Sequence, residues 1–107
     1  MALTRNFRET IQAEIERDPN FRKALLQEAV ECLLADDIQT GKAILRDFIN
    51  GTIGFESLSK QTEIPSKSLM RMFSPGGNPT ATNLFGVIAC LQSEEGVSIQ
   101  VKVKKAA

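Results

Sequence analysis

The chain contains no histidine, no tryptophan and no tyrosine, and only two of its 107 residues are cysteine. Without histidine, a histidine-based catalytic triad and a histidine-ligated zinc site are excluded. Cys32 and Cys90 stand alone in apolar stretches, so a disulfide or a metal site is a minor alternative. No phosphate-binding loop or distinctive carboxylate pair indicates catalysis. We therefore expect a binding protein without a cofactor rather than an enzyme.

The sequence also has no apolar run of membrane-spanning length and no net charge. Residues 1–9 include polar side chains from the start and lack the apolar stretch of a signal peptide. We therefore expect a cytoplasmic protein. Thirteen Lys and Arg residues balance thirteen Asp and Glu residues. Because charge alone does not favour nucleic acid, any nucleic-acid site must be a shaped surface with few contacts.

What the chain does have is helical periodicity, with 42% hydrophobic residues available for one core. One apolar stripe repeats at intervals of four: Leu3, Phe7, Ile11 and Ile15. It favours packing against the next helix, and a docking surface for a partner is the alternative. Asp18 and Pro19 then predict the start of a second helix over residues 19–35.

Three helices after the first are expected to contribute apolar faces to the core. The helix over 19–35 should bury Phe21, Leu25, Leu26, Ala29, Val30, Leu33 and Leu34. After the caps Asp36 and Asp37, the next helix should bury Ile38, Gly41, Leu45, Phe48 and Ile49, with Lys42, Arg46 and Asp47 outside. A last helix, over about 81–93 and capped by Thr80, should bury Leu84, Phe85, Ile88, Ala89 and Leu91.

Residues 55–73 predict two short helices joined by a tight turn. A helix-turn-helix needs a small residue at the helix crossing, and Ser59 provides one. Apolar residues at the right offsets lock the crossing: Leu58, Ile64, Leu69 and Met72. The outer positions of the second helix remain free for contacts: Ser66, Lys67, Ser68, Met70 and Arg71.

This segment resembles the helix-turn-helix of phage-repressor-type (Cro-like) regulators. Within that superfamily, residues 64–72 and 74–80 are similar to the antidote (antitoxin) proteins of bacterial addiction modules. Residues 41–50 match the helix that precedes their motif, and the resemblance covers about residues 36–103. Glu63 departs from the pattern, because the superfamily usually has glycine in this turn. A non-glycine residue at positive φ is expected to cost roughly 1 kcal/mol there.

The resemblance implies an all-α, five- to six-helix phage-repressor-like domain with a helix-turn-helix, followed by a short C-terminal β-strand. The expected parts are an N-terminal helical extension (1–35), the DNA-binding domain (36–96), and the strand with its basic tail (97–107).

In this interpretation the second helix of the motif enters the major groove of DNA. Lys67 and Arg71 reach guanine acceptors or phosphates, and Ser66 and Ser68 offer short hydrogen-bonding groups beside Met70. The loop and the start of the last helix contact phosphates through four residues: Gly77, Asn78, Thr80 and Thr82. Such phosphate contacts position the protein without reading sequence.

The C-terminal segment alternates apolar and polar residues, and its apolar members are Val97, Ile99, Val101 and Val103. This period predicts a strand. A lone strand leaves its backbone unpaired, so we expect it to pair with the same strand of a second subunit. The alternatives are packing on its own helices, addition to a partner's sheet, and a dimer formed by the N-terminal stripe.

Together these features predict a sequence-specific DNA-binding transcriptional repressor that acts as a homodimer on a palindromic operator. The resemblance implies that it is an antitoxin, which neutralises a small toxin protein and represses their shared operon. The alternative is a protein-interaction module whose helix-turn-helix no longer binds DNA.

Overall fold

Helices make up all the regular secondary structure in the part of the chain that is described. The computed structural model describes residues 2–107, with the side chains of residues 7 and 9–107. Its six helices are α1 (Ala2–Arg17), α2 (Pro19–Leu34), α3 (Ile38–Gly51), α4 (Gly54–Thr62), α5 (Ser66–Met72) and α6 (Ala81–Glu95). The predicted all-α class and the helix count are confirmed.

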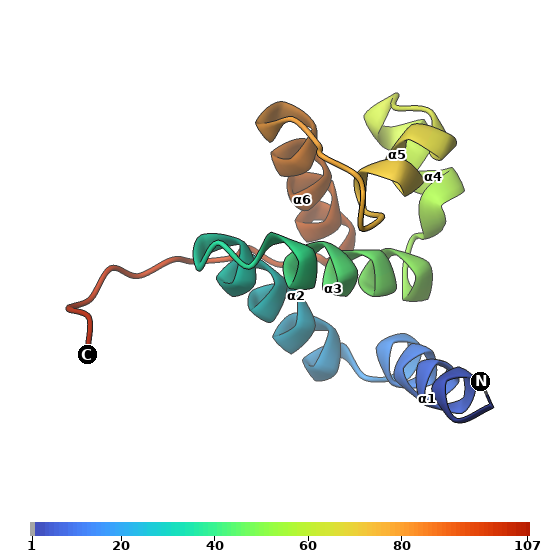
Figure 1. The fold of residues 1–107 in the computed structure, drawn as a ribbon, viewed down its shortest axis with the longest axis horizontal. Coiled ribbons are helices and arrows are strands. Elements are labelled where there is room, and N and C mark those ends of the chain that lie inside the picture. The colour runs from blue at the N-terminus through green and yellow to red at the C-terminus, as the bar shows by residue number, and fades with distance from the viewer. Residues whose placement is uncertain (1) are drawn as a thin grey trace.

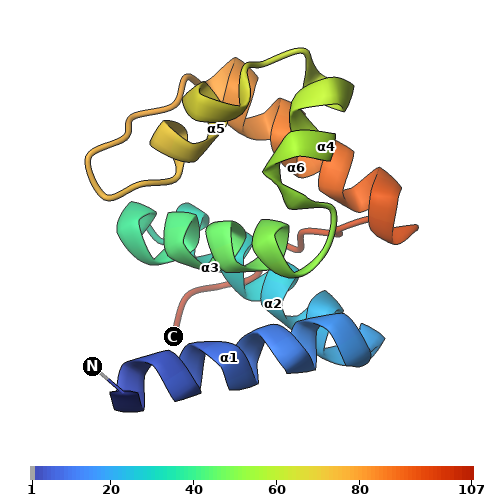
Figure 2. The ribbon, with the colours of Figure 1, turned by 90° about the vertical axis from the view of Figure 1, so that its right-hand side faces the viewer.

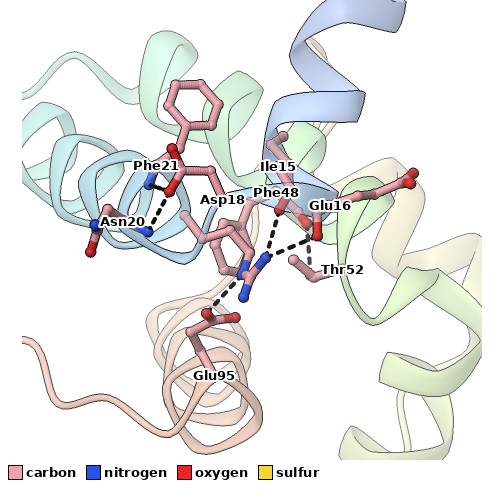
Figure 3. Close-up of polar contacts among 9 residues, drawn as sticks. Ile15, Glu16, Asp18, Asn20, Phe21, Phe48, Thr52 and Glu95 are labelled. Atoms are coloured by element: carbon pink, nitrogen blue, oxygen red, sulfur yellow. Dashed lines mark hydrogen bonds and ion pairs between the residues drawn. The ribbon is translucent and has the colours of Figure 1, made fainter.

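Side-chain caps fix where three of the helices begin. The Asp18 carboxylate accepts the backbone N–H groups of Asn20 and Phe21 at 3.0 and 3.3 Å (Figure 3). Asp37 accepts from the third residue of α3 at 3.4 Å, and Thr80 accepts from the third residue of α6 at 3.1 Å. Each cap satisfies an N–H group that has no carbonyl partner within its helix. These starts are the ones that the sequence predicts.

The core lies between a lower layer, formed by α2 and α3, and an upper group formed by α4, α5 and α6 (Figures 1 and 2). Helix α4 packs against α3, α5 and α6, and α1 lies on the opposite side of α3. One cluster of buried side chains joins α2 to α6: Leu26, Ala29, Leu45, Phe48, Ile49, Phe55, Leu58, Leu69, Met72, Phe73, Val87, Ile88 and Leu91. Ile15 of α1 is buried as well.

Arg22 of α2 joins three helices through one half-buried guanidinium. Its Nε lies 2.7 Å from a carboxylate oxygen of Glu95 at the end of α6. Its Nη1 donates to the carbonyls of Ile15 and Glu16 at 2.8 and 3.2 Å, at the C-terminal end of α1 (Figure 3). A cation at this position also interacts favourably with the helix dipole of α1.

The apolar stripe of α1 is only partly used. Ile15 is fully buried, Ile11 is half-buried, and Phe7 is 67% exposed. The side chain of Leu3 lies outside the described residues. Helix α1 packs on α3 as well as on α2, whereas the stripe was expected to meet the next helix alone.

Four residues predicted to face inward do not. Leu34, Ile38 and Phe85 are 71%, 39% and 64% exposed, and Ala89 is also exposed. Leu34 and Ile38 flank the turn between α2 and α3, where the chain leaves the core. Helix α6 has apolar residues around more than one face, and only the face with Val87 meets the core.

The predicted C-terminal β-strand is absent from the described residues, so this expectation is wrong. A strand needs a partner for its backbone, and this chain provides no second strand within residues 2–107. Val97 and Ile99 instead lie half-buried against the core, and the Ile99 N–H donates to Gln92 Oε1 at 2.7 Å. Val101 and Val103 are 69% and 100% exposed. Val97 and Ile99 thus follow the alternative prediction, in which this segment packs on the helices of its own chain.

Candidate nucleic-acid interface

The turn between α4 and α5 depends on a left-handed residue. Glu63 has φ 61° and ψ 25°, which ends α4 and redirects the chain within three residues. Its N–H donates to the carbonyl of Ser59 at 2.8 Å, and the Ser59 hydroxyl donates to the carbonyl of Ile64 at 2.6 Å. The positive φ expected at Glu63 is thus present, and Ser59 serves both as the small residue and as a hydrogen-bond donor.

Helix α5 has one face that packs on the core and one that faces solvent. The solvent side, here called the free face, carries Lys67, Met70 and Arg71. Leu69 is fully buried and Met72 nearly so, which fixes the helix on the core. Lys67, Met70 and Arg71 are exposed, whereas two further residues predicted for this face, Ser66 and Ser68, are half-buried. Among the described residues, no hydrogen bond or ion pair involves the charged groups of Lys67 and Arg71. These cations are available to an external partner.

The structure brings part of this face together with the loop that follows α5. Ser68 and Arg71 line an open depression of about 360 Å³ together with Gly77 and Asn78. The same depression includes four residues outside the predicted set: Ile64, Met72, Gly76 and Asn83. A cation, backbone amides and side-chain amides therefore surround one small concavity, which is a suitable environment for an anion.

The remaining predicted contact residues lie around this depression rather than in it. Ser66, Lys67 and Met70 line neither this depression nor the one beside it. Thr80 is exposed and caps α6. Thr82 lines the neighbouring depression of about 270 Å³, whose other walls are Gln61, Thr62, Ile64, Asn83, Gly86 and Cys90.

The C-terminal residues predicted for dimerisation lie elsewhere. Val97 and Ile99 border a small depression of about 130 Å³ along α2, lined also by Lys23, Leu26 and Gln27. Beyond it the tail runs away from α4 and α5 (Figure 1). This segment is therefore separate from the free face of α5.

The position of Lys42 in α3 differs from the prediction and affects the loop beside the site. It was expected to face outward, but its side chain is 1% exposed. Its ammonium donates to the carbonyls of Ser74, Pro75 and Gly77 at 2.9, 3.4 and 2.7 Å. An ammonium has three donors, and the loop supplies three acceptors. The charge is buried because each of its donors is satisfied.

A signal for this burial was present in the spacing. Lys42, Leu45 and Ile49 are separated by three and four residues, so they share one face of α3. The loop over 74–79 contains two prolines and two glycines, and cannot satisfy all its carbonyls locally. Lys42 was nevertheless predicted to face solvent, because charged side chains are seldom buried.

Both cysteines are free, and the pKa of each thiol is raised above its ordinary value. Burial, followed by the carboxylates of Asp37, Glu28 and Glu31, raises the pKa of Cys32. Burial and the nearby Glu94 raise the pKa of Cys90. Thiolates are the reactive and metal-binding form, and these surroundings disfavour it.

The described residues contain neither a metal-binding cluster nor a membrane-spanning helix. No group of three or more His, Cys, Asp or Glu side chains is placed to hold a metal ion within residues 2–107. Over the same residues, no helix combines the length and the apolar character needed to cross a bilayer.

Comparison with known proteins gave no match: no family model, no curated protein and no solved structure is similar to this chain.

Proposed function

We propose that this protein is a sequence-specific DNA-binding transcriptional repressor in which α4 and α5 form a helix-turn-helix. The observation that carries the proposal is the free face of α5. It presents Lys67 and Arg71, without internal partners among the described residues, on a helix that Leu69 anchors in the core. A recognition helix needs this combination of a fixed backbone and available donors.

In this proposal α5 lies in the major groove. Lys67 and Arg71 donate to guanine acceptors or phosphates, and Ser66 and Ser68 serve as short hydrogen-bonding groups. Met70, which is 49% exposed, supplies an apolar contact such as a thymine methyl group prefers. Gly77, Asn78, Thr80 and Thr82 contact the sugar-phosphate backbone and set the position of α5.

The zero net charge supports a dimer rather than a single site. One protomer offers few cations at the proposed face, so it would bind weakly and with little dependence on salt. Two protomers on a palindromic operator double the number of contacts, and the pair of recognition helices can then match two half-sites at once. We therefore propose a homodimer with half-sites about one helical turn apart.

The resemblance to addiction-module antidote proteins extends the proposal to a partner. We propose that the protein is an antitoxin, which binds a small toxin protein and represses their common operon. The test is co-expression of this chain with the product of the adjacent reading frame. Rescue of growth and a stable co-purified complex support the proposal, and growth arrest despite abundant antitoxin contradicts it.

One observation favours the alternative of a protein-interaction module. Phe7 and Phe85 are 67% and 64% exposed, and large exposed aromatic side chains are frequent at protein interfaces. The two interpretations differ in their outcome when the protein selects from a pool of random duplexes. A repressor enriches a discrete palindromic sequence, whereas an interaction module enriches none.

A further inference from the structure

Lys42 lies behind the loop that follows α5, on the side away from solvent, and its hydrogen bonds set the direction of the loop's peptide groups. The acceptors are the carbonyls of Ser74, Pro75 and Gly77, at 2.9, 3.4 and 2.7 Å from the ammonium nitrogen. All three carbonyls are consequently directed toward the interior, where the side chain is 1% exposed.

The opposite edges of these peptide groups follow from covalent geometry. A trans peptide is planar, with its N–H antiparallel to its carbonyl, and the described residues contain no cis peptide bond. Because the carbonyls of Pro75 and Gly77 point to Lys42, the N–H groups of Gly76 and Asn78 point outward. Neither of these N–H groups has a hydrogen-bond partner within residues 2–107. The third peptide precedes proline and has no N–H.

Both outward N–H groups belong to residues that line the depression beside α5. Gly76 and Asn78 share it with Arg71 and Asn83, so the residues that carry two unpaired backbone donors lie beside a cationic residue at one open concavity. Oriented backbone N–H groups beside a cation form an environment that binds anions.

The loop has little freedom to take another shape. The Gly77 N–H donates to the Ser74 carbonyl at 3.0 Å, and the Arg46 guanidinium donates to the Phe73 carbonyl at 3.4 Å. A Cβ atom on Gly77 would lie 1.9 Å from the carbonyl oxygen of Arg71, so only glycine fits. Lys42 is thus part of a rigid connection between α3 and the end of α5.

We infer that Lys42 is a positioning residue that presents the N–H groups of Gly76 and Asn78 to a phosphodiester of bound DNA. Its own charge does not reach the duplex; it acts through the loop carbonyls. This inference rests on the proposed function, because the phosphodiester belongs to the DNA that α5 contacts.

The experiment is an NMR titration of the ¹⁵N-labelled protein with the palindromic duplex that the wild-type protein enriches from a random pool, about 20 base pairs long, at low salt. In the wild-type protein, the amide resonances of Gly76 and Asn78 should move downfield with saturation. The ammonium protons of Lys42 should exchange with water far more slowly than those of the exposed Lys23. These two wild-type measurements require no variant, so they are decisive even where a variant fails to fold.

The variant K42M keeps the length of the side chain and removes the donors. It should lose the shifts at Gly76 and Asn78 while the amides of Lys67 and Arg71 still respond. Affinity should fall by at least about tenfold, the lower bound for the loss of a single hydrogen bond to a charged group, because two such donors are misplaced. The slope of log K against log salt should stay at the wild-type value, because neutral N–H groups displace no counterion from the duplex. The matched control K23M, with the same loss of charge, should behave as wild type in every measurement.

Four results would overturn the inference. The first is a wild-type titration in which the α5 amides respond and those of Gly76 and Asn78 do not, which leaves the proposed function intact. The second is a folded K42M protein with wild-type shifts and affinity. The third is a K42M salt slope that is smaller by about 0.9, because Lys42 would then neutralise a phosphate directly. The fourth is the absence of any amide response in the wild-type protein, which rejects the proposed function as well.

Discussion

Glu63 has the left-handed backbone conformation that forms the turn of the proposed helix-turn-helix. Its φ of 61° allows α4 to end and α5 to begin within three residues. That conformation is unfavourable for a residue with a Cβ atom, and the cost is roughly 1–2 kcal/mol. The turn is formed nonetheless, because Leu58 and Leu69 on its two sides are both fully buried. Packing of the two helices therefore offsets the strain.

The substitution Glu63→Gly should stabilise the protein. It removes a strain of roughly 1–2 kcal/mol and adds about 0.5–1 kcal/mol of unfolded-state freedom, which leaves a net gain of about 0.5–1 kcal/mol. Thermal unfolding should shift upward by roughly 2–8 °C. The control Glu56→Gly, in the first turn of α4, should lower the melting temperature, because glycine is unfavourable in a helix. Equal shifts for both variants would exclude strain at Glu63.

Leu69 and Met70 are neighbours in sequence with opposite surroundings, 0% and 49% exposed. Leu69→Ala should reduce the free energy of unfolding by roughly 2–5 kcal/mol, because it leaves a cavity at the contact of α5 with the core. Met70→Ala should change it by less than about 0.5 kcal/mol. Chemical denaturation of both variants measures the difference, and similar stabilities would mean that α5 is rotated from the orientation described.

At the scale of elements, periodicity and capping were sufficient to predict the six helices. Asp18, Asp37 and Thr80 each accept the hydrogen bond that a helix start requires. The orientation of Phe85 was not predictable, because α6 has apolar residues on several faces and the choice depends on its neighbours. The interior position of Lys42 depends on three carbonyls from a loop about thirty residues later, a contact that local pattern does not contain.

The free face of α5 was predicted better than its surroundings. Lys67, Met70 and Arg71 are exposed as expected, since they fall between the buried positions of the helix. That Arg71 shares a depression with Gly76 and Asn83 follows from the path of the loop, which sequence spacing does not determine. The prediction of a strand over 97–103 was wrong. Alternating apolar residues suit a strand, but its backbone also needs a neighbouring strand for hydrogen bonding.

The C-terminal segment should divide into a structural part and a dispensable part. Ending the chain after Gln100 removes residues that are all exposed, so the melting temperature should stay unchanged. Ending it after Gly96 also removes Val97 and Ile99, which cover the core, and should lower the melting temperature. Helical circular dichroism should persist in both. A stable protein that ends at Gly96 would show that the segment contributes nothing to the fold.

For the whole molecule, the balance of thirteen cations and thirteen anions limits how DNA can be bound. Affinity must come from a few placed contacts, and the proposed dimer doubles them. Sedimentation with a selected palindromic duplex should give two protomers per duplex. A single protomer on the palindrome at saturation would contradict the dimer and leave the free face of α5 as the only source of specificity.

The central claim is that the free face of α5 reads DNA. The most direct measurement is the affinity of the double variant K67A/R71A for the duplex selected by the wild-type protein, at matched salt. The control K23A/K104A removes two other exposed lysines. We predict that K67A/R71A melts like the wild type but binds more weakly by roughly 1–3 kcal/mol for each base that is no longer recognised, whereas the control retains wild-type affinity. Equal affinity of K67A/R71A and the wild type would contradict the claim.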